Sequence, residues 1–214
     1  MKTVLIVSGG NISKDLVCKN LSKDEIFAII AVDKGLEILN DLNIEPTDII
    51  GDFDSVSLEI LNKYINSSCH IHKYQSEKDF TDTEAAIEIA IKKQPEQIIL
   101  LGATGTRLDH TLANIHIMKK ILDHNIVCKN IDTNNEILLI DKNFKLEKNN
   151  NYKYISLIPL TSVVTGITLK GFKYSLNNAI LNIGQSLGIS NEQLEKEAFI
   201  DIQTGILIIM QSKD

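Results

Sequence analysis

The sequence predicts an α/β fold with a Rossmann-like parallel sheet for residues 1–133, followed by an all-β sandwich for residues 134–214. In the first part, short continuous apolar runs alternate with stretches of helical spacing, which is typical of parallel strands joined by helices. In the second part, β-branched residues and alternating polarity dominate, with turn residues between the runs. With 214 residues, the chain is long enough for each part to bury its own core.

The composition excludes several classes of protein. The net charge of −6 disfavours binding to nucleic acid, because no cationic excess is available to replace the counterions of a phosphate backbone. Cys18, Cys69 and Cys128 lie far apart, which argues against a disulfide framework and a zinc site and indicates reduced thiols in the cytoplasm. No apolar stretch approaches the length needed to span a membrane. We therefore expect a cytoplasmic protein, which can still bind a small anionic ligand where cations gather locally.

The individual elements follow from apolar spacing. Continuous apolar runs predict strands in the first part at residues 3–7, 27–32, 48–50, 69–74 and 98–101. Helical spacing predicts helices near residues 35–39, 57–65, 85–90 and 112–122. Alternation predicts strands in the second part at residues 136–140, 152–159, 163–170, 198–203 and 206–210.

Acidic residues gather where the strands of the first part end. Asp52 and Asp54 follow a short apolar run, and side chains at this spacing point the same way if the segment is extended. Asp33, Asp82 and Asp109 also fall at predicted strand ends or helix starts. Because like charges repel, this cluster predicts a bound cation, and paired carboxylates suit Mg²⁺ and therefore phosphates. The alternative for Asp52 and Asp54 is a turn that caps the next helix.

Two glycine-rich loops of the first part also point to an anion. The turn at residues 8–11 contains two glycines, which let the backbone approach a ligand. The loop at residues 102–110 leads into a helix, so its backbone amides suit a phosphate. Arg107 in this loop is the single arginine in a chain with 21 lysines, which indicates that its planar group is needed, as in bidentate phosphate binding. The alternative is an ion pair with Asp109.

The charged segment at residues 77–84 precedes a predicted helix. Thr81 with Glu84 three residues later forms a capping box, and Asp82 suits the positive end of the helix. Capping does not account for Lys78 and Asp79, which come before the helix. With Lys78 and Arg107 added to the carboxylates, a nucleoside triphosphate with Mg²⁺ is the predicted ligand.

Together, the motifs resemble the thiamine pyrophosphokinase family. They occur in the family's order, as VDKG (32–35), GDFDS (51–55), EKDFTD (77–82), GATGTRLDH (102–110), GFKY (171–174) and SLGISN (186–191). Each motif is weak by itself, but the set covers most of the chain and is specific. The sequence has no P-loop, kinase signature set or HExxH motif.

The resemblance implies an enzyme that transfers the pyrophosphoryl group of ATP to the thiamine hydroxyl, giving thiamine diphosphate and AMP. It implies a homodimer whose active site lies between the ATP- and Mg²⁺-binding first domain of one subunit and the thiamine-binding second domain of the other. It assigns Mg²⁺ to Asp33, Asp52, Asp54 and Asp82, the nucleotide to Lys78, Asp79, Thr81, Arg107 and Asp109, and thiamine to Tyr174, Ser190 and Asn191. The expected catalytic residues are Asp82, Asp54 and Arg107, with Asp82 the first candidate to orient or accept the hydroxyl proton.

Two positions depart from the family pattern: Tyr174 stands where some relatives have tryptophan, and Thr106 stands where glycine is usual. Two rival functions stay open. One is a pyrophosphokinase that acts on another alcohol, such as a hydroxymethylpterin. The other is a noncatalytic regulatory protein that binds thiamine diphosphate or a nucleotide. A metal-dependent phosphohydrolase is a weaker third alternative.

Overall fold

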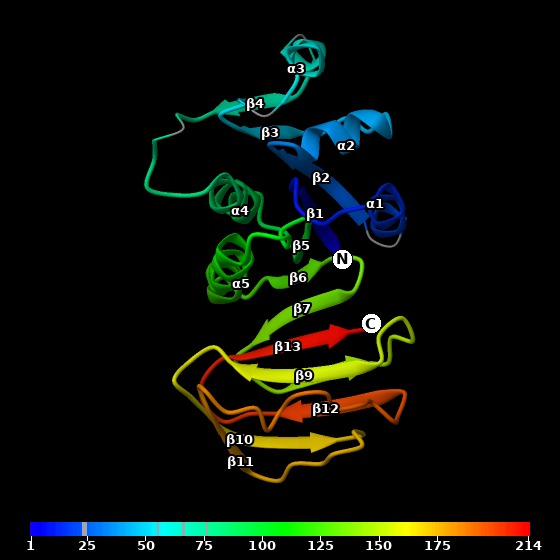
Figure 1. The fold of residues 1–214 in the computed structure, drawn as a ribbon, viewed down its shortest axis with the longest axis vertical. Helices are drawn as coiled ribbons and strands as arrows, with labels where there is room; N and C mark the ends of the chain where they lie inside the picture. The colour runs from blue at the N-terminus through cyan, green and yellow to red at the C-terminus, as the bar shows by residue number, and fades with distance from the viewer. Residues whose placement is uncertain (23–24, 55, 66, 76) are drawn as a thin grey trace. The chain divides into compact units, whose positions relative to one another are not determined.

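The chain divides into two compact units, Met1–Thr133 and Asn134–Asp214. The computed structural model describes residues 1–22, 25–54, 56–65, 67–75 and 77–214 (Figure 1). Ser55, which belongs to the GDFDS motif, lies outside the described residues.

A parallel sheet forms the centre of the first unit. Its strands are β1 (Lys2–Val7), β2 (Glu25–Val32), β3 (Asp48–Gly51), β4 (His70–Lys73), β5 (Gln97–Leu101) and β6 (Val127–Ile131). They lie in the order β4-β3-β2-β1-β5-β6, and every neighbouring pair is parallel. Both faces of the sheet are covered, which is why β1 and β5 read as continuous apolar runs in the sequence.

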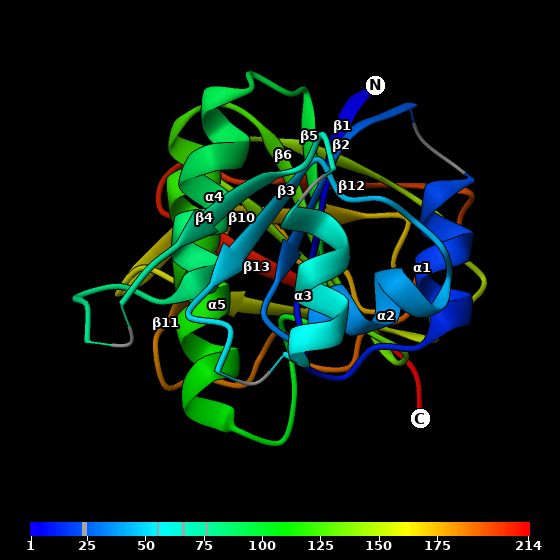
Figure 2. The same cartoon turned by 90° about the horizontal axis from the view of Figure 1, so that it is seen from above.

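Helices cover this sheet on both faces. They are α1 (Lys14–Leu21), α2 (Gly35–Asp41), α3 (Leu58–Ile65), α4 (Asp82–Lys92) and α5 (Leu108–Asp123). Figures 1 and 2 both show α4 and α5 on one side of the strands, and α1 and α2 on the other. Val17 of α1 and Leu36 of α2 pack into one core with Leu5 of β1. The apolar stripe of each helix is therefore buried against the sheet.

The second unit consists of antiparallel strands. They are β7 (Asn135–Ile140), β8 (Phe144–Glu147), β9 (Tyr154–Pro159), β10 (Val163–Lys170), β11 (Ala179–Asn182), β12 (Glu197–Asp201) and β13 (Leu207–Ser212). One group has the order β7-β13-β9 and the other has the order β11-β10-β12-β8. Leu138 and Ile209 from the first group and Ile167 and Ile200 from the second belong to one hydrophobic core.

The predicted class, an α/β part with a mostly parallel sheet followed by an antiparallel part, is confirmed. The sequence reasoning missed α1, β6, β8 and β11. None of the helices in the described ranges is long and apolar enough to cross a membrane.

Candidate active site

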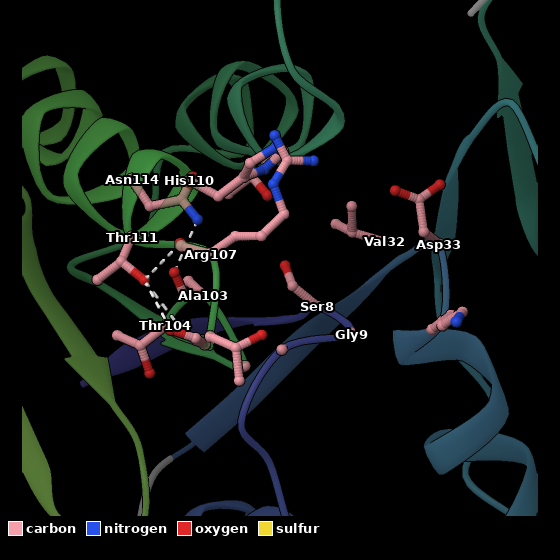
Figure 3. A pocket seen from close by; sticks show the side chains of 16 residues that line it. Ser8, Gly9, Val32, Asp33, Ala103, Thr104, Arg107, His110, Thr111 and Asn114 are labelled. Carbon is pink, nitrogen blue, oxygen red and sulfur yellow. Dashed lines mark hydrogen bonds between the residues drawn. The ribbon is translucent and has the colours of Figure 1, made fainter. Parts of the chain in front are cut away.

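A cavity opens where the strand order of the first unit reverses. β1 lies beside β5, but β1 leads to α1 on one face and β5 leads to α5 on the other. The chain therefore continues to opposite faces of the sheet after these two neighbouring strands, and ligands of open α/β sheets bind at such a point. The cavity has a volume of about 540 Å³ (Figure 3). It is lined by Ser8, Gly9, Gly10, Val32, Asp33, Lys34, Thr83, Gly102, Ala103, Thr104, Gly105, Thr106, Arg107, His110, Thr111 and Asn114.

The two glycine loops form the floor of this cavity. The Gly10 amide donates to the Gly102 carbonyl at 2.8 Å, and the Asn11 amide donates to the Thr104 carbonyl at 2.6 Å. A Cβ on Gly10 would collide with the carbonyl oxygens of Gly102 and Thr104, so the close contact between the loops requires glycine. Because carbonyls already use these two amides, they are not available to a phosphate.

Two buried hydrogen bonds fix the loop that follows β5. The Thr104 hydroxyl donates to the Asp132 carboxylate at 2.7 Å, and the Asn114 side-chain amide donates to the Ala103 carbonyl at 2.7 Å. Both pairs are buried. The sequence reasoning missed Asn114 and Asp132, although Asp132 directly follows β6 and so fits the rule of polar residues at the carboxyl ends of strands.

Arg107 stands at the start of α5 as its N-cap, with no side-chain capping bond. Its guanidinium donates to Asp109 twice, from Nη2 at 2.7 Å and from Nε at 3.3 Å. This bond lowers the pKa of Asp109 to about 2, helped by a hydrogen bond from the His110 amide. The ion pair that was the alternative role for Arg107 is therefore present. Since both side chains are well exposed, the pair leaves the guanidinium accessible at the cavity.

Asp33 follows β2 with a left-handed backbone, at φ 47°, and faces the cavity from the side opposite α5 (Figure 3). Its Oδ1 is buried and has no hydrogen-bond partner among the described residues. Burial first, and then the charges of Asp82 and Asp52, raise the pKa of Asp33 to about 6, and Lys78 offsets this only in part. A Cβ on Gly51, at φ 156°, would collide with this Oδ1, so glycine allows the carboxylate to lie against β3.

Asp52 and Asp54 form a turn rather than the expected extended pair. Phe53 between them has φ 65°, so the alternation that would point both carboxylates the same way does not apply. The Asp54 amide donates to Asp52 Oδ1 at 3.1 Å, as in an Asx-turn. The prediction that the segment is extended was wrong, because the backbone folds back on the first carboxylate.

A side-chain cap and a largely buried ion pair order the segment before α4. Thr81 is the N-cap of α4, and its hydroxyl accepts the Glu84 amide at 3.1 Å, so this half of the predicted capping box is confirmed. Lys78 pairs with Asp82 at 2.7 Å, and both side chains are largely buried. Lys78, Asp79 and Thr81 line a second hollow of about 550 Å³, different from the cavity that Arg107 lines.

No three acidic, histidine or cysteine side chains within the described ranges meet closely enough to hold a metal ion as they stand. Asp52 and Asp82 nevertheless each lie within electrostatic reach of Asp33. A bound cation would supply a partner for the buried Asp33 Oδ1 and relieve the repulsion that raises its pKa. The donor set, made of carboxylate oxygens, suits Mg²⁺.

In the second unit, Tyr174, Ser190 and Asn191 come together. The Asn191 side chain accepts the Tyr174 amide at 3.0 Å and donates to the Tyr174 carbonyl at 2.7 Å. The Ser190 amide donates to Ser156 Oγ at 3.0 Å, and Ser190 has φ 58°. The Asn191 amide group is therefore used to hold the backbone of Tyr174, while the Tyr174 ring is largely exposed.

Family models match both units in order. Residues 19–129 match the thiamin pyrophosphokinase catalytic domain, and residues 142–207 match the thiamin pyrophosphokinase vitamin B1 binding domain. A thiamine pyrophosphokinase of Bacillus subtilis is 39% identical over 217 residues, with 100% of both chains covered.

Solved structures agree with these matches. A crystal structure of thiamine pyrophosphokinase from Bacillus subtilis has a TM-score of 0.90 at 37% identity, covering 100% of each chain. One from Geobacillus thermodenitrificans has a TM-score of 0.87 at 29% identity, covering 99% of this chain and 98% of that one. The resemblance seen in the motifs is thus confirmed, and the chain belongs to the thiamine pyrophosphokinase family of enzymes.

Proposed function

We propose that this chain transfers the pyrophosphoryl group of ATP to the hydroxyl of thiamine, giving thiamine diphosphate and AMP. Residues 1–133 act as the catalytic domain that binds ATP with Mg²⁺, and residues 134–214 bind thiamine. The proposal rests on the family and on one feature of the site. At the cavity above the glycine loops, a buried oxygen of Asp33 has no partner among the described residues, and the pKa of Asp33 is raised first by burial and then by the charges of Asp82 and Asp52.

Asp33, Asp52, Asp54 and Asp82 hold Mg²⁺ in this proposal. The repulsion that Asp52 and Asp82 exert on Asp33 supports a cation at this place. When bound, Mg²⁺ would supply neutralisation of the negative charge on the phosphate oxygens. The turn holds the Asp52 carboxylate against the backbone amide of Asp54.

The triphosphate lies in the cavity between Arg107 and Asp33. The Arg107 guanidinium binds phosphate oxygens, and Asp109 holds it in position through their two hydrogen bonds. The N-cap residue Arg107 makes no side-chain capping bond, so the start of α5 adds backbone amides other than that of His110, which donates to Asp109. Lys78, Asp79 and Thr81 contact the nucleotide from the neighbouring hollow before α4, where the Lys78 ammonium lies over the rings of Tyr74 and Phe80.

In the reaction, the thiamine hydroxyl oxygen forms a bond to the β-phosphorus while the bond to the oxygen that leaves with AMP breaks. Phosphoryl transfer of this kind depends on positioning and on stabilising the charge of the oxygens. Asp82 is the candidate to orient the hydroxyl or accept its proton, and the Lys78 ion pair at 2.7 Å fixes the orientation of its carboxylate. Arg107 stabilises the negative charge of the phosphate oxygens, and Asp54 is one of the four carboxylates that hold Mg²⁺.

Tyr174, Ser190 and Asn191 bind thiamine in the second unit. The two hydrogen bonds between the Asn191 side chain and the Tyr174 backbone support a positioning role for Asn191, with the exposed Tyr174 ring as the contacting surface. The enzyme acts in the cytoplasm as a homodimer whose active site combines the first unit of one subunit with the second unit of the other.

We also propose that the first unit is Rossmann-like and that the second is a β-sandwich. Helices on both faces of the parallel sheet support the first assignment. The core that residues of both antiparallel groups share supports the second, because two sheets that pack face to face enclose one core.

The test is AMP formation from ATP and Mg²⁺, with and without thiamine. We expect AMP and thiamine diphosphate in equal amounts, only when thiamine is present, and no AMP when a chelator removes Mg²⁺. A folded protein that binds ATP but produces no AMP with thiamine would contradict the proposal. AMP formation with a hydroxymethylpterin and not with thiamine would identify the other pyrophosphokinase, and release of phosphate without an alcohol would identify a phosphohydrolase.

A further inference from the structure

Ser8 is a buried serine at the floor of the cavity, and none of the described residues makes a hydrogen bond with its hydroxyl. It directly follows β1, and its amide donates to the Leu101 carbonyl at 2.8 Å, which fixes the backbone. The residue is 6% exposed. Its Oγ has no hydrogen-bond partner in the part of the chain that the structure describes.

Burying a hydroxyl without a partner is unfavourable, and alanine would fill nearly the same space without this cost. Two other hydroxyls of the same cavity have hydrogen-bond partners in the protein. Thr104 donates to Asp132 at 2.7 Å, and Thr111 accepts the Gly105 amide at 3.1 Å. The contrast points to a partner for Ser8 that comes from outside the chain.

The surroundings of Ser8 indicate which chemistry this partner has. In Figure 3, Ser8 lies between Arg107 at the start of α5 and Asp33 beyond β2. Gly9, Gly10 and the loop after β5 form the nearby wall, and His110 carries the one aromatic ring in the described lining. A hydroxyl donor, a guanidinium and a helix start suit phosphate oxygens, which only accept hydrogen bonds.

We propose that the Ser8 hydroxyl donates a hydrogen bond to a phosphate oxygen of the bound nucleotide. This inference rests on the proposed function for its ATP site and adds a binding residue that lies outside the family motifs noted above. Asp33 lines the same cavity, and its buried Oδ1 also lacks a partner among the described residues. In this inference the Asp33 carboxylate binds the cation and the Ser8 hydroxyl binds the phosphates.

The test is Ser8→Ala, compared with wild type in three ligands: MgATP, magnesium tripolyphosphate, which has phosphates and no nucleoside, and adenosine, which has a nucleoside and no phosphate. Because the hydroxyl is unpartnered in the free protein, we expect the ligand-free melting temperature to stay the same or to rise. We expect the dissociation constants for MgATP and tripolyphosphate to rise about 10- to 100-fold, since a hydrogen bond to a charged group is lost. Adenosine binding stays unchanged.

Ser156→Ala is the matched control. Ser156 is a buried serine of β9 whose Oγ does have a partner, the Ser190 amide at 3.0 Å. We expect this variant to lower the melting temperature and to leave tripolyphosphate binding unchanged. The two serine variants therefore separate a hydroxyl used by the fold from one used by a ligand.

Several outcomes would overturn the inference. These are wild-type binding of tripolyphosphate and MgATP by Ser8→Ala, a loss confined to adenosine, or no binding of either phosphate ligand by wild type. A fall in melting temperature as large as in Ser156→Ala would show a structural hydroxyl instead. If Ser8→Ala does not fold, Ser8→Cys, which keeps the shape and weakens the donor, undergoes the same measurements.

The assay also separates this inference from the proposed function. If wild type forms AMP only with thiamine but Ser8→Ala binds phosphates normally, the inference about Ser8 fails alone. If wild type forms no AMP but its binding of tripolyphosphate depends on Ser8, the reaction is wrong and the phosphate contact holds.

Discussion

The two edges of the parallel sheet in the first unit treat a buried carboxylate in opposite ways. At the amino edge, Asp48 begins β3 and is almost fully buried. It accepts from Thr47 Oγ1 at 2.7 Å, from Lys93 Nζ at 2.9 Å and from His72 Nε2 at 3.0 Å. At the carboxyl edge, Asp33 follows β2 and has an oxygen with no partner among the described residues.

The pKa values of Asp48 and Asp33 shift in opposite directions because, of the two, only Asp48 has hydrogen-bond donors around its carboxylate among the described residues. Burial acts on Asp48 to raise its pKa, but the hydrogen bonds from Lys93, Thr47 and His72 lower it overall. Burial also acts on Asp33, and there neighbouring carboxylates add to it, so its pKa rises to about 6. The fold is thus able to satisfy a buried carboxylate, and the edge where it does not is the edge that holds the cavity. We therefore expect carboxylates at the amino edge to contribute to stability and those at the carboxyl edge to contribute to function.

The largest expected effect is the loss of catalysis from a change at the carboxyl edge. Asp54→Asn removes one charge from an exposed turn and leaves the fold intact. We expect thiamine-dependent AMP formation to fall about 1,000-fold, as when one electrostatic group of a transition state is removed. The melting temperature should match that of wild type. Near-normal turnover in a folded Asp54→Asn protein would contradict both the assignment and the functional nature of this edge.

The next effect is a loss of stability from a change at the amino edge. Asp48→Ala leaves Lys93 and His72 without their partner, and we expect the free energy of unfolding at pH 7 to fall by about 2 kcal/mol. The cost stays moderate because both partners are partly exposed and can turn to water. Denaturant unfolding measures it, and the rate per folded molecule should hardly change.

The pH dependence of this loss checks its cause. Because the pKa of Asp48 is lowered from 3.8 in the fold, its contribution to stability is present above pH 3.8 and disappears as the pH falls through the folded value. The difference between wild type and Asp48→Ala should therefore shrink below about pH 4. A constant difference down to pH 2.5 would assign the loss to packing instead.

A smaller effect comes from Arg107, whose pair with Asp109 admits two interpretations. If the guanidinium binds phosphate in bidentate fashion, Arg107→Ala raises the KM for ATP about tenfold and Arg107→Lys recovers only part of it. Asp109→Asn is the control, because it removes the pair and keeps the cation. Steady-state kinetics at varied ATP measure all three variants. Equal effects of Arg107→Ala and Asp109→Asn would show that the ion pair matters and that the guanidinium does not bind phosphate directly.

The fold was predictable where each segment carries its own signal. Residues 4–7 of β1 and 98–101 of β5 are apolar throughout, since both faces of the sheet are covered. β6 was missed because it contains the polar residues Lys129 and Asn130. Asparagine is usually exposed, but Asn130 is only 1% exposed. β8 and β11 have only four residues each, too few to show alternation.

The candidate site was predictable as a set of residues and not as a geometry. Asp33 could be placed at a strand end from the sequence, but the lack of a partner for its oxygen is a tertiary fact. The left-handed backbone of Phe53, at φ 65°, changed the direction of the carboxylates beside it and has no sequence signal, since the residue is not glycine. Ser8 escaped notice because a serine after a strand is ordinary until its surroundings are known.

The smallest effect tests the contrast from the side of Asp33. Because its pKa is raised, this carboxyl contributes to the stability of the fold below pH 3.8 and loses that contribution as the pH rises through about 6. At pH 8 the carboxyl is charged, and the charged form lowers the free energy of unfolding relative to a neutral side chain. Asparagine tolerates the left-handed backbone at φ 47° and carries no charge. We therefore expect Asp33→Asn to stabilise the ligand-free protein at pH 8 by about 1 kcal/mol, allowing for solvent screening of a half-buried group, and to give no gain at pH 4. Denaturant unfolding at the two pH values measures this, and the stabilisation of wild type by MgATP should be lost in the variant. A variant less stable than wild type at pH 8 would mean that the fold does satisfy Asp33, and the difference between the two edges would disappear.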